Sequence, residues 1–178
     1  QLLQGDPALE LSLQLDRWAY GAGVPDNAVH VKSATLAEVD QKIAAFVAGG
    51  PAKAVNPKGW NTQQWLRFLN GLPRQLPANR LADLDRSLNL SQSTNAYARS
   101  AWLQLAIANR YEPALPSLRQ FATSVGRGLF IKPLYSDLRA QGAWGKSIAV
   151  DLFQAAKPTY HPSVAQSVEQ IIADGASE

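Results

Sequence analysis

The chain has 178 residues, of which 46% are hydrophobic and 17% are charged, with tryptophan at five positions, so its composition is that of a folded domain and excludes a disordered tail. The formal net charge is +3, and the 17 basic and 14 acidic side chains alternate without forming a basic block, so we expect no nucleic-acid partner. No apolar run approaches the roughly 18 residues of a membrane span, which predicts a soluble protein with no membrane partner. Because the chain has no cysteine, the composition fits a cytoplasmic or a periplasmic protein equally well.

The first 32 residues predict an irregular connector. Glycine and proline recur among a few short apolar groups, at Gly5, Pro7, Gly21, Gly23 and Pro25. Such punctuation favours extended chain and turns over long helices. We therefore expect residues 1–32 to link the rest of the chain to a preceding domain, and residues 33–178 to form a separate helical domain.

From Ser33 onward the apolar residues recur with the period of a helix, and proline, glycine and asparagine mark the helix ends. The first predicted helix carries Val39, Ile43, Phe46 and Val47 and stops at Gly49. Later helices are expected to start at Asn61, near Pro77, at Ser93 or Thr94, at Pro113 or Pro116, at Pro133, before Ile148 and at Pro162. No strand-like alternation interrupts the series, so the predicted fold class is all-α, as a bundle or as a layered superhelix.

One arginine stands between two of these helices. The apolar residues Leu118, Phe121, Ala122 and Val125 predict a helix that Gly126 closes as a left-handed residue. Arg127 follows directly, and is expected to project from the turn before the next helix. A guanidinium is always charged and can donate two parallel hydrogen bonds to a carboxylate.

The chain lacks the residues of a catalytic centre. A zinc peptidase needs a His-Glu-x-x-His helix and a further carboxylate ligand, whereas the two histidines here, His30 and His161, stand far apart. His161 precedes Pro162 at a predicted helix start, where a cap or a packed surface residue is expected. No Gly-x-Ser-x-Gly motif is present either. We expect the isolated chain to be non-catalytic and to bind no cofactor.

A series of motifs nevertheless resembles one known family. In order, these are Ser91-Gln-Ser-Thr-Asn95, Trp102-Leu-Gln-Leu-Ala-Ile107, Tyr111-Glu-Pro113, Gly126-Arg127, Phe130-Ile-Lys-Pro-Leu-Tyr135 and His161-Pro162. The stretch from about Leu15 to about Ile172 is similar to the C-terminal helical domain of the leukotriene A4 hydrolase family of zinc aminopeptidases and its bacterial relatives. The resemblance implies a curved, two-layer, armadillo- or HEAT-like helical superhelix.

The resemblance also implies a function. It makes the chain a C-terminal accessory domain of a zinc metallo-aminopeptidase, which closes the active-site cleft while the zinc sits in a catalytic domain upstream on the same polypeptide. Arg127 matches the arginine with which the family binds the carboxylate of a short peptide substrate. Lys132 keeps a basic residue just before Pro133, and the alternatives for it are a secondary substrate contact or a structural role. The vertebrate enzyme has a lysine two residues beyond that arginine, where this chain has Leu129, which argues against a lipid-epoxide activity.

Another function class remains open. A helical superhelix can also act on its own, as a scaffold that binds a protein partner along its concave face. An exposed apolar patch and a gene without an upstream metallopeptidase would favour that interpretation.

Overall fold

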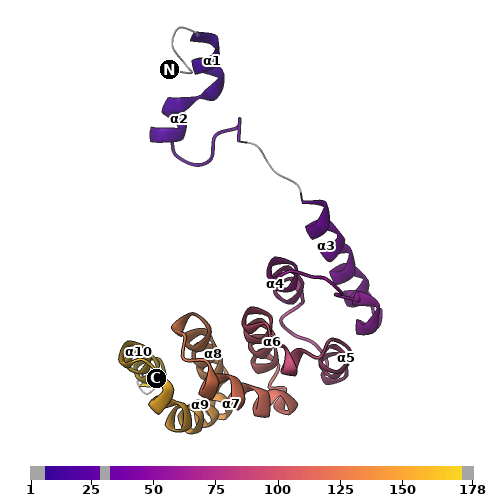
Figure 1. The fold of residues 1–178 in the computed structure, drawn as a ribbon, viewed down its shortest axis with the longest axis vertical. Helices are drawn as coiled ribbons and strands as arrows, with labels where there is room; N and C mark the ends of the chain where they lie inside the picture. The colour runs from indigo at the N-terminus through magenta and orange to yellow at the C-terminus, as the bar shows by residue number, and fades with distance from the viewer. Residues whose placement is uncertain (1–6, 29–32, 174–178) are drawn as a thin grey trace. The chain divides into compact units, whose positions relative to one another are not determined.

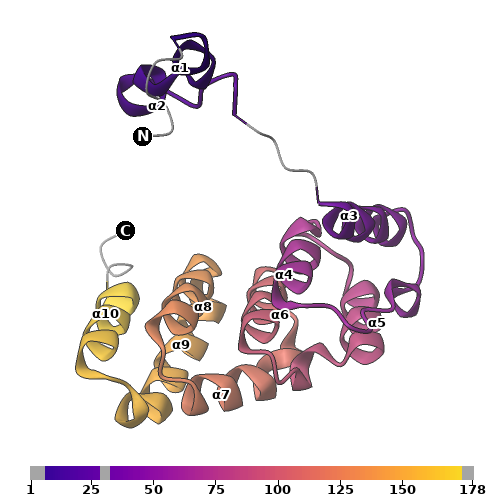
Figure 2. The ribbon, with the colours of Figure 1, turned by 45° about the horizontal axis from the view of Figure 1, so that its top comes forward.

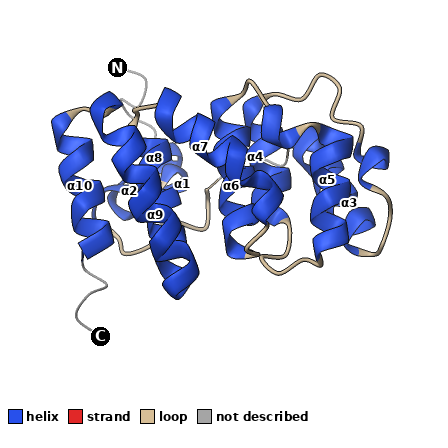
Figure 3. Cartoon of the chain, turned by 90° about the horizontal axis from the view of Figure 1, so that it is seen from below, coloured by secondary structure: helices blue, strands red, loops and turns tan. Residues whose placement is uncertain are grey.

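The computed structural model describes residues 7–28 and 33–173. Within these ranges the chain forms ten α-helices and four short 3-10 helices and contains no β-strand (Figure 3). The predicted all-α class is therefore confirmed. The chain divides into two compact units at residues 34 and 35, and each is described by itself.

The first unit contains two short helices, α1 (Pro7–Leu13) and α2 (Leu15–Tyr20), where the sequence predicted only extended chain and turns. A single left-handed residue, Gln14 with φ of 51°, separates them. The side chain of Asn27 folds back onto both helices, since its Nδ2 donates to the carbonyl of Leu13 at 3.0 Å and its Oδ1 accepts from Trp18 Nε1 at 3.0 Å. These contacts between residues distant in sequence stabilise helices that are too short to persist alone.

The second unit contains the remaining helices (Figure 1). In chain order they are α3 (Ala34–Val47), α4 (Thr62–Gly71), α5 (Ala78–Leu88), α6 (Ala96–Ala108), α7 (Leu115–Ser124), α8 (Gly128–Ala140), α9 (Gly142–Ala156) and α10 (Pro162–Ala173). Short 3-10 helices lie between them, η1 (Ala52–Val55), η2 (Leu90–Gln92), η3 (Glu112–Ala114) and η4 (Lys157–Thr159).

Two predicted helix starts are wrong. The cap of α6 is Asn95, whose Oδ1 accepts from the N–H groups of Tyr97 and Ala98, and neither Ser93 nor Thr94 takes that place. Helix α8 begins at Gly128, so Pro133 lies inside the helix and not in its first turn. Extending the helix to Gly128 buries Phe130 and Ile131, and this burial outweighs the one hydrogen bond that a proline cannot donate.

The helices of the second unit lie in two layers. Helices α4, α6, α8 and α10 pack side by side in one layer, and α7 and α9 pack against each other behind them (Figure 2). The inner helices α4, α6 and α8 are each followed by an outer helix that runs back, so the four inner helices are parallel to one another. The layers curve with α4, α6, α8 and α10 on the inner side of the arc. This arrangement confirms the predicted two-layer superhelix.

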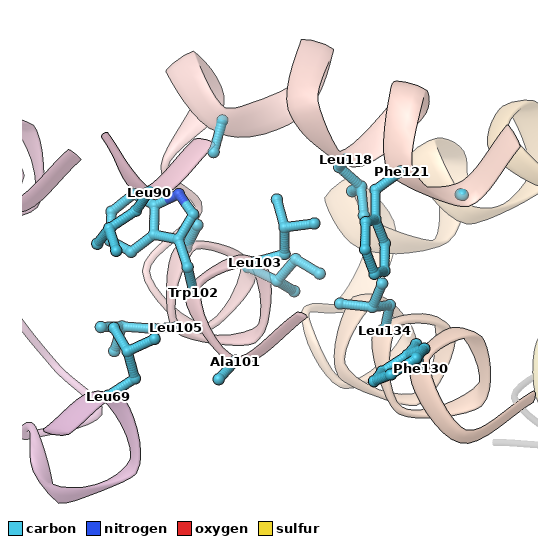
Figure 4. Close-up of a cluster of buried hydrophobic side chains, with 14 of the residues drawn as sticks. Leu69, Leu90, Ala101, Trp102, Leu103, Leu105, Leu118, Phe121, Phe130 and Leu134 are labelled. Atoms are coloured by element: carbon cyan, nitrogen blue, oxygen red, sulfur yellow. The ribbon is translucent and has the colours of Figure 1, made fainter. Parts of the chain in front are cut away.

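The core of the second unit is centred on α6, which is buried on nearly all sides. Trp102 of this helix is fully buried beside Leu90, and its Nε1 donates to Ser91 Oγ at 3.0 Å (Figure 4). On the other side of α6, Phe121 of α7 packs edge-to-face against Phe130 of α8, with ring centres 6.1 Å apart. Phe130 thus lies where the core approaches the start of α8.

Asn109, just beyond the end of α6, joins this helix to the link before α5. Its Oδ1 accepts from the N–H of Leu76 at 2.8 Å, and its Nδ2 donates to the carbonyls of Arg74 at 2.9 Å and Leu105 at 2.8 Å. A side-chain amide offers four hydrogen-bonding positions, and this partly buried one uses three of them. The residue therefore fixes how the link 74–76 crosses the end of α6.

Candidate functional site

The link between α7 and α8 consists of Val125, Gly126 and Arg127. The prediction that Gly126 closes α7 in a left-handed conformation is wrong, because Gly126 is not among the residues with positive φ. Glycine is needed there for a different reason. A Cβ atom at this position would lie 2.9 Å from the carbonyl oxygen of Thr159 in η4. The link therefore packs backbone to backbone against the segment that leads into α10.

Arg127 occupies the N-cap position of α8. Its carbonyl accepts from the N–H groups of Phe130 at 3.0 Å and Ile131 at 3.2 Å, while its side chain makes no capping hydrogen bond. Asparagine, aspartate, serine and threonine are the residues that normally cap helices. The sequence here places a cation where capping would favour a short polar acceptor.

The guanidinium of Arg127 is exposed, and within the described residues it forms no ion pair. Its central carbon lies 5.8 Å from the centre of the Phe130 ring, which is within the range of a cation–π contact. The ring supports the guanidinium from one side without occupying its N–H donors. Those donors are available to a ligand.

Lys132 lies one turn further along α8. Its aliphatic chain passes over Gly128, since a Cβ atom at that glycine would lie 3.3 Å from Lys132 Cε. The side chain is exposed and, like that of Arg127, has no acidic partner in the described part of the chain. The structure thus places both predicted site residues at the beginning of α8. Their role in substrate binding stays a prediction.

The starts of the four inner helices lie along the same edge of the layer. Asn95 Nδ2, at the start of α6, donates to Thr62 Oγ1 at the start of α4, at 3.0 Å. Gly128, at the start of α8, lies against Val164 of α10. The partial positive charge at each helix start makes this edge favourable for an anion.

The other three inner helices carry side-chain caps at this edge. Asn61 caps α4 in a capping box with Gln64, as the sequence predicted, and Asn95 caps α6. His161 Nδ1 accepts from the N–H of Ser163 at 3.3 Å, so His161 caps α10, which also agrees with the prediction. Among these four helices, only α8 begins without a side-chain acceptor over its first turn.

A pair of buried tyrosines lies beneath the link. The hydroxyls of Tyr135 in α8 and Tyr160 before α10 are 3.3 Å apart. Burial raises the pKa of Tyr160 and, more strongly, that of Tyr135, so both stay neutral. The pair joins the second half of α8 to the segment against which Gly126 packs.

The described residues contain no metal centre. No group of three or more His, Cys, Asp or Glu side chains within 7–28 and 33–173 could hold a metal ion. The only described histidine is committed to capping α10, and His30 lies outside the described residues. Within the same ranges no helix is long and apolar enough to cross a membrane.

Sequence reasoning missed two aromatic neighbours of the site. Tyr97, in the first turn of α6, packs edge-to-face on Phe130 with ring centres 4.9 Å apart. The spacing of Arg127 and Phe130, three residues apart at a helix start, was a weak signal for their contact. Nothing in the sequence indicated that Tyr97, 30 positions before Arg127, would share the same ring.

The fold and this edge define a helical-repeat domain that presents a cation from an uncapped helix start. The chain belongs to the family described as "Leukotriene A4 hydrolase, C-terminal", whose model matches residues 60–172. The proposed division at residues 32 and 33 lies outside this match and stays a prediction.

Relatives agree with this assignment. The human protein Aminopeptidase RNPEPL1 (Homo sapiens) is 33% identical over 131 residues, which are 72% of this chain and 18% of that protein. Aminopeptidase B of Mus musculus is 24% identical over 90% of this chain and 26% of its own length. A solved structure titled "Structure of native yeast LTA4 hydrolase" is similar in fold, with a TM-score of 0.69, 22% identity, and coverage of 91% of this chain and 29% of that one. The chain therefore spans less than a third of each of these proteins.

Proposed function

We propose that this chain is the C-terminal accessory domain of a zinc aminopeptidase, in which it closes the active-site cleft and binds the free carboxylate of a short peptide through Arg127. The observation that carries the proposal is the exposed guanidinium of Arg127, which has no acidic partner in the described chain and stands at the start of a helix. A carboxylate there would accept two charge-assisted hydrogen bonds and would also meet the positive end of α8.

The remainder of the polypeptide would supply the chemistry. Zinc would have to be bound there, because the described residues of this chain do not form a ligand set. The names of the relatives support the class, since two of them are aminopeptidases. The role of this chain would be to select substrates that end in a charge close to the scissile bond.

The test is Arg127→Ala in the complete polypeptide, assayed on a tripeptide with a free carboxylate and on the same tripeptide with a carboxamide end. Loss of a charge-assisted pair costs about 1.5–3 kcal/mol, so kcat/KM for the free acid should fall roughly ten- to a hundredfold. The amide should be affected little. Lys132→Ala should produce a smaller loss in the same direction.

Arg139→Ala is the matched control. Arg139 is an exposed arginine in the last turn of the same helix, away from the proposed site. It should leave both substrates unchanged. Equal losses for acid and amide in Arg127→Ala would contradict carboxylate binding and would favour a domain that acts only as a scaffold.

A further inference from the structure

The second unit exposes few large apolar side chains, and two of them flank the proposed carboxylate site. Over residues 33–173 the exposed ones are Val47, Tyr97 and Leu129, with 51%, 38% and 56% of their surface accessible. Tyr97 is the second residue of α6 and Leu129 the second residue of α8. The two helices are parallel neighbours in the inner layer, so both side chains lie at the same level of the same edge.

Phe130 joins this apolar pair to the cation. Its ring packs edge-to-face on Tyr97 at 4.9 Å between centres, and it supports the guanidinium of Arg127 at 5.8 Å. Phe130 itself is only 6% exposed, so it lies beneath the Tyr97 ring and the Arg127 guanidinium and supports both. The guanidinium of Arg127 and the ring of Tyr97 both contact Phe130, so the two lie close enough for one short peptide to reach both.

We propose that Tyr97 and Leu129 contact the side chain of the last residue of the peptide, and that the domain therefore prefers substrates with an apolar C-terminal residue. This inference rests on the proposed carboxylate site. A carboxylate held by Arg127 places the side chain of the same residue within a few ångströms of the guanidinium. The exposed large apolar surfaces there are the aromatic ring of Tyr97 and the aliphatic side chain of Leu129.

The charge of the edge argues for this occupant. Arg127 and Lys132 have no acidic partner within 7–28 and 33–173, and together with the uncapped start of α8 they favour the binding of an anion. The apolar pair calls for a hydrophobic group directly beside that anion. A peptide that ends in leucine or phenylalanine supplies both within one residue.

The experiment compares kcat/KM of the complete polypeptide on four tripeptides, which end in leucine or glycine, each as the free acid and as the amide. Tyr97→Ser and Leu129→Ser should each lower the preference for leucine over glycine by about three- to tenfold, the low end of what an apolar pocket provides, because the pair is partly open to solvent. The ratio of acid to amide should stay as in the wild type. Leu129→Met and Tyr97→Phe keep the apolar surface and should keep the preference.

Val47→Ser is the control, because Val47 is the remaining exposed large apolar residue among residues 33–173 and lies at the end of α3. It should change neither ratio. If the serine variants at 97 and 129 leave the leucine preference intact while the wild type still favours acid over amide, the inference is overturned and the carboxylate site stands. If they reduce all four substrates equally and lower the melting temperature, the pair packs against the rest of the enzyme, and the inference is again wrong. If the wild type does not distinguish acid from amide, the proposed function itself fails.

Discussion

Replacing Arg127 by asparagine should make the chain more stable while it removes the proposed function. Asn95 shows what a cap at the equivalent place does, because its side chain accepts from the N–H groups of the second and third residues of α6. The backbone of Arg127, with φ of −77° and ψ of 118°, already has the conformation of an N-cap. An asparagine there would accept from the N–H of Leu129, which has no intrahelical partner.

The size of the effect follows from three contributions. A good N-cap is worth about 1 kcal/mol relative to alanine, and removing a cation from a helix start relieves about 0.3–1 kcal/mol. The lost cation–π contact with Phe130 is exposed and costs about 0.5 kcal/mol. The free energy of unfolding should therefore rise by about 1 kcal/mol over the wild type, which corresponds to roughly 2–4 °C in Tm for a chain of this size.

The measurement is urea denaturation of the 178-residue chain at low salt, followed by circular dichroism, for the wild type, Arg127→Asn and Arg127→Ala. Alanine removes the cation without adding a cap, so it separates the two effects. An asparagine variant no more stable than the alanine variant would refute the reasoning, since it would mean that the first turn of α8 gains nothing from a side-chain acceptor. In the complete polypeptide the same asparagine should abolish the preference for a free carboxylate, so that stability rises as function is lost.

Three further changes test the packing around the site and the core. Gly126→Ala should lower the free energy of unfolding by about 1–3 kcal/mol, because the new Cβ meets the backbone of η4. Gly128→Ala meets side-chain atoms of Val164 and Lys132 at 3.2 and 3.3 Å and no backbone, so it should cost less than Gly126→Ala in the same denaturation assay. Burial raises the pKa of Asp137 above its ordinary value of 3.8, so its charged form destabilises the folded chain at pH values above the raised pKa and has no effect below 3.8. Asp137→Asn should therefore increase the free energy of unfolding at pH 7, and this gain should disappear as the pH falls below 3.8. An unchanged stability at pH 7 would contradict this. Asn109→Ala removes the bridge to residues 74–76 and should cost about 2–3 kcal/mol, seen as a lower denaturation midpoint at an unchanged slope.

The helices of the second unit could be predicted because their signals are local. Apolar residues repeat on one side of each helix, and proline, glycine or asparagine stands at the ends, as at Asn61. The two short helices of the first unit escaped prediction because Asn27 holds them with hydrogen bonds to residues far along the chain. Pro133 was misplaced because burial of the residues before it decided where α8 begins.

The candidate site was predictable only in part. Arg127 and Lys132 were singled out by resemblance to a family, and their roles remain predictions. The physical setting of Arg127 depends on contacts across the fold, and these cannot be read from neighbours in sequence. Gly126 illustrates the limit. The sequence indicated that a glycine matters at this position, but the predicted reason was wrong, because the atom that excludes a side chain is the carbonyl oxygen of Thr159, 33 residues later.

The short link between α7 and α8 has a consequence for the thermodynamics of binding. Only three residues separate two helices that both contribute to the core, and the middle one is fixed against η4. A ligand at Arg127 would find the backbone already ordered, and would have to immobilise only the arginine side chain, at about 2 kcal/mol of rotamer entropy. A longer loop would add about 1–2 kcal/mol for each residue that becomes ordered on binding. Affinity at this edge would thus come from a pre-organised backbone, and lengthening the link by a few glycines should weaken binding even if every contact to the ligand were retained.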